Sequence, residues 1–298
     1  MDTRTTPSGL ADAVGARWLR SRHGTHIVDQ LIDERSVNIS RNPLWPVVRW
    51  LALRHLYYHQ AVEMVDHAST LPGRQVMDFV SETLALDVRA HGAENIPAEG
   101  GFVLAPTHPT GIADGVAIYD IIMKRRPDAL FFGNRDAVRV APGLADLIIP
   151  VEWRKAEKTH AKSRDTLAAT ARAFAAGRPL VMFPSGRIAF WNDGELTERP
   201  WQNSVVTLAR RYGYPIVPAH IAARNSGLFY LISRYSTDLR DMTLFRELLN
   251  KKGRRFEVTL GRPVDPERLA GDPAEVARRL QHHTVTVLAN NPQAEFEG

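Results

Sequence analysis

The pattern of hydrophobic positions changes at about residue 84, where short apolar runs begin to alternate with longer periodic stretches. The short runs predict strands at 84–91, 101–107, 128–134, 147–151, 179–184, 215–221 and 254–261. The longer stretches, with apolar residues every three or four positions, predict helices at 113–126, 159–176, 199–212 and 273–289. Apolar strands joined by helices are typical of a parallel sheet with both faces covered. We therefore predict an α/β fold: a mainly parallel mixed sheet with helices on both faces, preceded by an N-terminal helical segment.

The residues before this point carry a different pattern. Residues 1–8 are polar and predict a disordered tail, and residues 9–82 predict a helical segment with breaks at Gly24 and 41–43. The alternating strands and helices then fill residues 83–298, which we expect to form the main domain.

Residues 44–58, within the helical segment, combine Trp and Tyr side chains with Arg49, Arg54 and His55. This mixture favours a helix lying among lipid head groups, where aromatic rings settle and cations meet phosphates. The alternative is a helix that covers the sheet while its arginines reach water. We expect contact with an anionic membrane surface.

Composition excludes several classes of protein. With 298 residues, 44% of them hydrophobic, the chain is long enough to bury one sizeable core. It has no cysteine, which excludes disulfides, thiolate nucleophiles and cysteine-ligated zinc. No apolar run reaches the length of about 20 residues that spans a bilayer, and residues 1–7 lack the apolar core of a signal peptide. We therefore expect a cytoplasmic location, on the inner face of the membrane.

The formal net charge of +5 favours anionic partners, among them nucleic acid, an anionic membrane and phosphate-bearing substrates. No nucleic-acid-binding module accompanies the charge, so we expect no nucleic-acid partner.

His108 and Asp114 form the leading candidate for catalysis. His108 follows the apolar run 101–106, so its imidazole is predicted at the end of a strand, where α/β proteins place their chemistry. Pro109 and Gly111 interrupt regular helix between the two residues, so a loop can bring the carboxylate onto the ring, as a general base requires. The alternative is a histidine at a strand end and an aspartate that caps the following helix.

Three later segments strengthen the catalytic interpretation. They are Phe131-Phe132-Gly133-Asn134-Arg135-Asp136, Phe183-Pro184-Ser185-Gly186-Arg187 and Pro215-Ile216-Val217-Pro218-Ala219-His220. With His108 and Asp114 they resemble the lysophospholipid acyltransferase superfamily, whose members carry four ordered blocks. The first block is a histidine followed, after four or five residues, by an aspartate, and the spacing here is five. Order and spacing both fit, and the resemblance covers roughly residues 84–265.

The resemblance implies an acyltransferase domain at 83–298 that moves an acyl chain from acyl-CoA or acyl carrier protein to a lysolipid or glycerophosphate-like hydroxyl, in membrane lipid biosynthesis. His108 would be the general base, and Asp114 would orient the ring and stabilise the imidazolium. No acyl-enzyme, cofactor or metal is implied. Backbone N–H groups of the turn at 109–115 are candidate donors to the oxyanion.

The resemblance also assigns substrate binding to the second and third blocks, at Arg135, Ser185, Gly186 and Arg187. A planar guanidinium can hold a phosphate or carboxylate at two points. The third block departs from the family pattern: a Glu usually stands at the position of Ser185, and a Thr-Arg pair follows the Gly, whereas Arg187 follows Gly186 directly. The missing carboxylate leaves room for an acceptor without phosphate, such as lyso-ornithine lipid. Ser185 is otherwise a small loop residue, and the following 190–194 stretch is either a wall of the site or a packed turn.

Residues 224–230 and 243–253 resemble, within the superfamily, a branch of bacterial acyltransferases labelled haemolysins, some associated with ornithine-lipid synthesis. Close to them, Lys251, Lys252, Arg254 and Arg255 predict a basic cluster that contacts anionic lipid or acyl carrier protein; the alternative is a solvated hairpin.

Other classes of protein fit less well. A serine hydrolase would carry Gly-x-Ser-x-Gly, but Phe183 occupies the first glycine position before Ser185. No Gly-Lys-Ser or Gly-Lys-Thr marks a phosphate-binding loop. A metal site at His108, Asp114 and His220 lacks the usual histidine spacing. A non-catalytic lipid-binding protein on the same fold is the remaining alternative, and the intact His108–Asp114 pair favours an enzyme.

Overall fold

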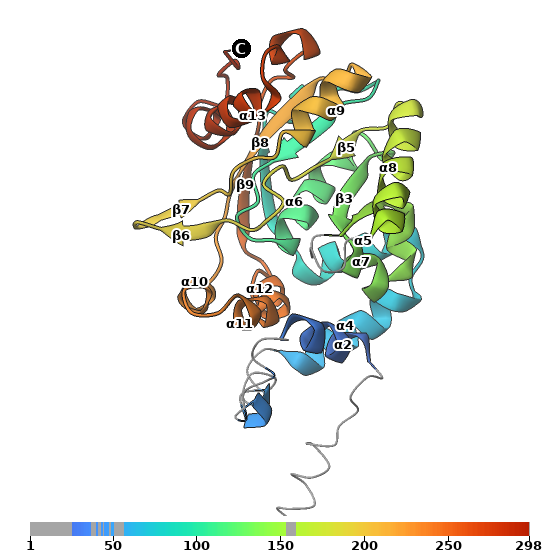
Figure 1. Cartoon of the computed structure of the whole chain (residues 1–298), viewed down its shortest axis with the longest axis vertical. Helices are drawn as coiled ribbons and strands as arrows, with labels where there is room; N and C mark the ends of the chain where they lie inside the picture. The colour runs from blue at the N-terminus through green and yellow to red at the C-terminus, as the bar shows by residue number, and fades with distance from the viewer. Residues whose placement is uncertain are drawn as a thin grey trace, which may run out of the picture.

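A seven-stranded sheet forms the centre of the computed structural model, which describes residues 26–36, 40, 43, 45–47, 49–50, 57–152 and 159–297. The strands follow the order β1-β9-β8-β2-β5-β3-β4 (Figure 1). They are β1 (Asp87–His91), β2 (Val103–Pro106), β3 (Leu130–Asn134), β4 (Ile148–Val151), β5 (Leu180–Val181), β8 (Ile216–Ala222) and β9 (Arg255–Leu260). Neighbouring strands run parallel except β8 and β9, which are antiparallel. The mainly parallel mixed sheet is confirmed, with shorter strands than predicted.

Helices cover both faces of this sheet, as the alternation of side chains along β2 shows. Leu104 packs in one core with α5 (Gly73–Leu84) and α6 (Ile112–Ile122). Its neighbours Val103 and Ala105 point the opposite way, into a second core. That core is closed by α8 (His160–Ala175), α9 (Ser204–Tyr212) and α13 (Pro273–His282). The central strands are therefore buried on both sides, which explains their continuous apolar runs.

The four predicted helices are present in the structure, but their first and last residues differ from the predicted ones. The helix expected at 199–212 begins only at Ser204, because Pro200 lies in an extended segment. The helix expected at 273–289 continues beyond His282 through a π-helical turn at His283–Val287 into α14 (Leu288–Asn290). Gly213 ends α9 in the left-handed conformation, as its position predicts.

The N-terminal region is helical where it is described. It contains α2 (Ile27–Arg35), α4 (Tyr58–Thr70) and α5. Met64 of α4 and Leu84 of α5 belong to the same core as α6. The division of the chain at residues 8 and 82 stays a prediction.

Part of the 44–58 segment lies outside the described residues, as does the predicted tail at 1–8. Trp45 is buried, while Val47 and Trp50 are exposed. A membrane role for Trp45 is therefore wrong, because its side chain packs in the protein. No helix in the described ranges is both long enough and apolar enough to cross a membrane.

Several short elements were not predicted. A hairpin of β6 (Phe190–Asn192) and β7 (Glu195–Thr197) follows the third block, and its Asp193-Gly194 turn has both residues at positive φ. A short helix, α7 (Arg135–Val140), follows β3, and a 3₁₀ turn at Pro142–Asp146 leads into β4. Beyond β8, the chain forms α10 (Gly227–Ser233), α11 (Thr237–Met242) and α12 (Leu244–Leu249), which lie together below the hairpin in Figure 1.

Candidate active site

The structure brings His108 and Asp114 together just beyond the carboxyl end of β2. Nδ1 of His108 lies 3.0 Å from Oδ2 of Asp114, whose side chain is fully buried. The same carboxylate accepts hydrogen bonds from the backbone N–H groups of Thr110 and Gly111, each at 2.8 Å, and from the Thr110 hydroxyl at 2.5 Å. Asp114 therefore does both things considered from the sequence: it orients the imidazole and it caps the start of α6.

This arrangement changes the expectation for the oxyanion. The N–H groups of Thr110 and Gly111 were candidate donors, but both point to the Asp114 carboxylate. A donor that is already bonded to a carboxylate cannot meet a developing negative charge without losing that bond. These two groups are therefore excluded as oxyanion donors in this conformation.

The second and third blocks lie at the same edge of the sheet, because β8, β2, β5 and β3 are neighbouring parallel strands. We call residues 108–114 the catalytic turn. The loop after β5 is joined to this turn by a hydrogen bond of 2.9 Å from the Ala189 N–H to the His108 carbonyl. The Phe183 ring lies 4.4 Å from the His108 ring. Sequence segments far apart in the chain therefore meet around one imidazole.

Each residue predicted to bind substrate has a distinct place. Ser185 is buried, and its hydroxyl donates to the carbonyl of Arg187 at 3.0 Å. Gly186 adopts positive φ in the turn between them. Arg187 is exposed, and Arg135 has Nε and Nη2 buried without a hydrogen-bond partner among the described residues. Ser185 and Gly186 thus shape the loop, Arg187 faces solvent, and Arg135 is partly buried.

Glu198 is a site residue that the sequence did not reveal. It is buried, and its two carboxylate oxygens lie 3.1 and 3.2 Å from the backbone nitrogen of His108, which donates to them. Burial raises the pKa of Glu198, while the Ser185 hydroxyl and the His108 N–H favour the ionised form. A carboxyl group therefore lies beside Ser185, the position at which the family usually has a Glu, but here it comes from a residue 13 positions later.

The raised pKa of Glu198 can be tested by measuring how the stability of the protein depends on pH. Its pKa in the fold lies above the ordinary value of 4.5, so ionisation destabilises the folded state once the pH rises past that value. Glu198→Gln should therefore raise Tm at about pH 8 and change it little at about pH 4, where the wild-type carboxyl is largely protonated folded or unfolded. Thermal unfolding at both pH values measures this. An equal gain at the two pH values would contradict a raised pKa.

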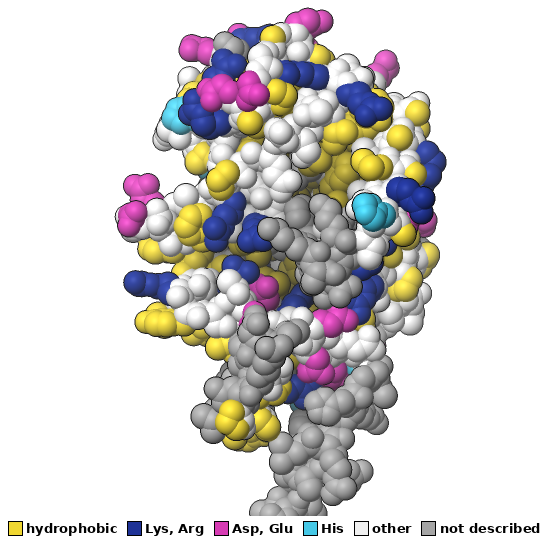
Figure 2. Space-filling view, in the orientation of Figure 1, with side chains coloured by type: hydrophobic (Ala, Val, Ile, Leu, Met, Phe, Trp, Pro, Cys, Tyr) yellow, Lys and Arg dark blue, Asp and Glu magenta, His cyan; other side chains and the backbone are white. Residues whose placement is uncertain are grey.

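The residue after Glu198 adds a cation to the site. The Arg199 guanidinium carbon lies 3.9 Å from the centre of the Phe190 ring, in a cation-π contact with the hairpin. Burial lowers the pKa of Arg199, and the positive charges of Arg187 and Arg240 lower it further. Figure 2 shows Lys and Arg side chains to the right of the hairpin. Neither Arg187 nor Arg199 forms an ion pair within the described part of the chain.

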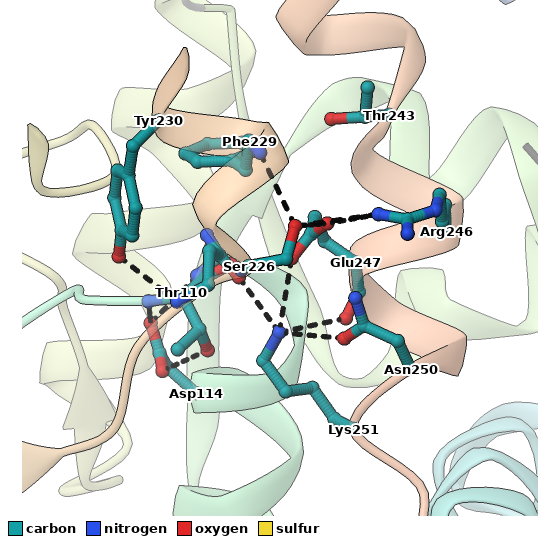
Figure 3. Close-up of polar contacts among 12 residues, drawn as sticks. Thr110, Asp114, Ser226, Phe229, Tyr230, Thr243, Arg246, Glu247, Asn250 and Lys251 are labelled. Atoms are coloured by element: carbon teal, nitrogen blue, oxygen red, sulfur yellow. Dashed lines mark hydrogen bonds and ion pairs between the residues drawn. The ribbon is translucent and has the colours of Figure 1, made fainter. Parts of the chain in front are cut away.

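A buried polar network supports the catalytic turn from the other side (Figure 3). The Asn225 side-chain amide donates to the Thr110 carbonyl at 3.2 Å, and its Oδ1 accepts from Nζ of Lys251 at 2.9 Å. Nζ of Lys251 also lies 3.3 Å from Oε2 of Glu247 and 2.9 Å from Oδ1 of Asn250. Burial lowers the pKa of Lys251, and the Glu247 carboxylate opposes that shift.

Lys251 is therefore not part of a surface cluster. The sequence suggested either a basic cluster or a solvated hairpin at 251–255. Both interpretations are wrong for the Lys251 side chain, because Asn225, Glu247 and Asn250 enclose its ammonium group. Lys252 and Arg254 are exposed, as expected.

The geometry suits proton transfer at a carbonyl centre. With Nδ1 of His108 directed at Asp114, the other ring nitrogen is left for a substrate hydroxyl, and the ring is partly exposed. Arg187 and Arg199 lie in the two segments that contact the His108 backbone, through Ala189 and Glu198. Within the described ranges, no group of three or more His, Asp or Glu side chains is arranged to hold a metal ion.

Comparison with known proteins agrees with this chemistry. Residues 87–222 match the family model described as Acyltransferase. A lyso-glycine lipid O-acyltransferase of Phocaeicola vulgatus is 26% identical over 219 residues, covering 71% of this chain and 77% of the relative. The enzyme of that name from Bacteroides thetaiotaomicron is 24% identical over 198 residues, covering 64% and 71%. Among solved structures, the 1-acyl-sn-glycerophosphate acyltransferase PlsC of Thermotoga maritima has a TM-score of 0.46 and 15% identity, covering 82% of this chain and 96% of that one.

Proposed function

We propose that this chain, whose residues 87–222 match the Acyltransferase family model, transfers a fatty acyl chain from a thioester to a lysolipid hydroxyl with His108 as general base. The observation that carries the proposal is the 3.0 Å contact between His108 and a fully buried Asp114. A buried carboxylate on the far ring nitrogen fixes the tautomer that accepts a proton and stabilises the imidazolium that results.

The proposed reaction needs no covalent enzyme intermediate. The acceptor hydroxyl loses its proton to the free ring nitrogen of His108 while its oxygen attacks the thioester carbonyl carbon. The tetrahedral adduct then collapses, the carbon–sulfur bond breaks, and the imidazolium returns the proton to the departing thiolate. An ester and a free thiol leave the site, and the histidine is neutral again. Acyl-CoA and acyl carrier protein both present such a thioester.

We propose an anionic acceptor that carries a carboxylate rather than a phosphate. The two relatives are named for a lyso-glycine lipid, and glycine has no side-chain hydroxyl, so O-acylation there implies a hydroxyl on the lipid chain. Arg187 and Arg199 carry two positive charges beside the imidazole and suit a planar carboxylate. A hydroxylated fatty acid joined to an amino acid, lyso-ornithine lipid included, has these groups. A phosphate-bearing lysolipid is the second candidate, favoured by the family blocks that hold Arg135 and Arg187.

A screen of acceptors tests both candidates. The purified protein would be given acyl-CoA or acyl carrier protein with each of two lysolipid sets, one bearing a carboxylate and one a phosphate, and the products read by mass spectrometry. Ester formation with the carboxylate set supports the first candidate, and formation only with the phosphate set supports the second. Lipid binding without any product would support the alternative of a non-catalytic lipid-binding protein.

The arginines predict a specific kinetic effect. Arg187→Ala and Arg199→Ala should each raise the acceptor KM by about 10- to 100-fold and leave the thioester KM nearly unchanged, because a charge-assisted contact is worth about 1.5 to 3 kcal/mol. Arg187→Lys should restore little, since an ammonium cannot hold an anion at two points. Steady-state kinetics with each substrate varied in turn measures this.

Arg211 supplies the matched control. It lies in the last turn of α9, at the opposite end of the strands from His108, and also contacts a ring, with its guanidinium carbon 5.6 Å from the Tyr212 centroid. Arg211→Ala should leave both KM values unchanged. Equal losses for both substrates in the Arg187 variant would instead assign that residue a structural role.

The proposal includes a peripheral position on the inner face of the membrane, where a lysolipid acceptor would be found. The basic pI of about 9.6 supports it, because cations attract an anionic leaflet. The exposed Val47 and Trp50 of the N-terminal segment suit the same location.

A further inference from the structure

Helix α10 exposes one apolar face. Leu228 is 42% exposed and Leu231 53%, and Tyr235, just after the helix, is 83% exposed. Their spacing of three and four residues places them on one side of the helix. Phe229 and Tyr230, on the other side, are buried. The helix is thus anchored by two aromatic rings and presents aliphatic and aromatic side chains to solvent. Their exposure to water is unfavourable, and burial against an apolar partner would remove that cost.

The hairpin extends this face. Trp191 of β6 is 45% exposed, and its ring centre lies 5.5 Å from that of Tyr230. We call Trp191, Leu228, Leu231 and Tyr235 the α10 face. Figure 2 shows hydrophobic side chains gathered at this corner of the molecule, below the hairpin. The exposed acids Asp193 and Glu195 occupy the tip of the hairpin and limit the apolar surface to its base.

Cations stand at both ends of the helix. Arg224 precedes α10 and Arg234 follows it, and both are exposed. Neither forms an ion pair with another described residue. An apolar helix face between two unpaired arginines is the pattern of a segment that sinks into the head-group layer, where the rings and aliphatic groups meet acyl chains and the guanidinium groups meet lipid phosphates.

We propose that the α10 face docks onto an anionic lipid bilayer. A second copy of the chain suits the face less well, because a symmetric pair would bring Arg224 and Arg234 of the two copies together. The helix has seven residues, so it lies in the interface and does not span.

Docking there places the active site at the lipid surface. The residue before the cap of α10, Asn225, donates its side-chain amide to the carbonyl of Thr110 at 3.2 Å, so the helix starts beside the catalytic turn. Exposed Ile112, at the first turn of α6, lies next to the same turn. A lysolipid could then bring its hydroxyl to His108 while its tail stays in the bilayer. This consequence rests on the proposed function; the binding itself does not.

Vesicle co-sedimentation of the full chain tests the proposal. Vesicles of phosphatidylcholine with phosphatidylglycerol should bind the wild type, and vesicles of phosphatidylcholine alone should bind it less. Leu231→Glu with Tyr235→Glu should weaken binding to the anionic vesicles at least about tenfold, because two apolar contacts are replaced by charges that repel the surface. Arg224→Gln with Arg234→Gln should reduce the preference for anionic vesicles.

Leu167→Glu is the matched control, because Leu167 is 65% exposed on α8, on a separate surface. It should bind vesicles as the wild type does. Equal binding by the α10 double variant and the Leu167 variant would overturn the proposal, as would failure of the wild type to bind anionic vesicles. A wild-type dimer that the α10 double variant converts to monomer, with vesicle binding unchanged, would assign the face to a second copy. Vesicle binding requires no acyl transfer, so it can hold even if every acceptor in the screen fails.

Discussion

Replacing His108 by alanine is expected to lower the rate of acyl transfer by about two to four orders of magnitude, the usual contribution of a general base. The imidazole is partly exposed, and among the described residues its hydrogen bond goes to Asp114, so the fold should survive the substitution. Asp114→Asn should also be severe, because an amide stabilises neither the required tautomer nor the imidazolium. Initial rates with a thioester donor, alongside circular dichroism of each variant, measure both effects.

His91 offers a matched control for this experiment. It too contacts a carboxylate, with Nε2 at 2.9 Å from Oε2 of Glu257, but it lies exposed on the edge strand β1. His91→Ala should leave turnover unchanged. A folded His108→Ala protein that keeps more than about a tenth of the wild-type rate would refute the general-base role.

The sequence predicted the sheet because burial on both faces leaves a direct trace, the continuous apolar run. Val103, Leu104 and Ala105 point alternately into two cores, and all are hydrophobic for that reason. Because β8, β2, β5 and β3 are parallel neighbours, the first three blocks, which lie at the ends of β2, β3 and β5, meet at one edge of the sheet. His108 could be proposed from the sequence because it follows a strand, whereas Arg135 and Arg187 were proposed through the family resemblance.

Short elements left weaker traces. Helices α10, α11 and α12 have seven, six and six residues, fewer than two full turns each, so no apolar period could distinguish them from loops. Their serine caps, Ser226 and Ser236, are visible in the sequence but are equally common in turns. The Asp193-Gly194 dipeptide is typical of a hairpin turn, but residues 190–194 were interpreted as a wall of the site or a packed turn, and not as a hairpin.

The residues that support the site could not be predicted from the sequence, because their hydrogen-bond partners are distant in the chain. Glu198 bonds the backbone of a residue 90 positions earlier, and Asn225 bonds one 115 positions earlier. A glutamate after a polar hairpin, or an asparagine before a serine, has no local feature that indicates burial. Lys251 was wrongly predicted to be exposed for the same reason. It lies in a basic run with Lys252 and Arg254, which indicates a surface position, whereas its ammonium group is buried in contact with Asn225 and Glu247.

Lys251→Met is expected to destabilise the protein by about 1.5 to 3 kcal/mol, because the buried Glu247 carboxylate loses one of its two cations and keeps only Arg246, at 3.0 Å. Methionine fills similar space, so the loss should come mainly from charge and hydrogen bonding rather than from a cavity. The Asn225 Oδ1 also loses its donor, and burial makes that costly. Urea unfolding of the purified variant gives the change in the free energy of unfolding.

Two further variants separate the buried pair from the charge run in which it occurs. Lys252→Met removes the same charge from an exposed neighbour and should change stability by less than about 0.5 kcal/mol. Combining Lys251→Met with Glu247→Gln should recover part of the loss, because the buried side chain that lost its lysine partner is then neutral. If the double variant is no more stable than Lys251→Met alone, the ammonium acts through packing and not through its charge. If Lys251→Met and Lys252→Met are equally mild, the network does not hold the catalytic turn, and Asn225 must be fixed to Thr110 by its other contact, the hydrogen bond from its backbone N–H to the Tyr230 hydroxyl at 3.0 Å.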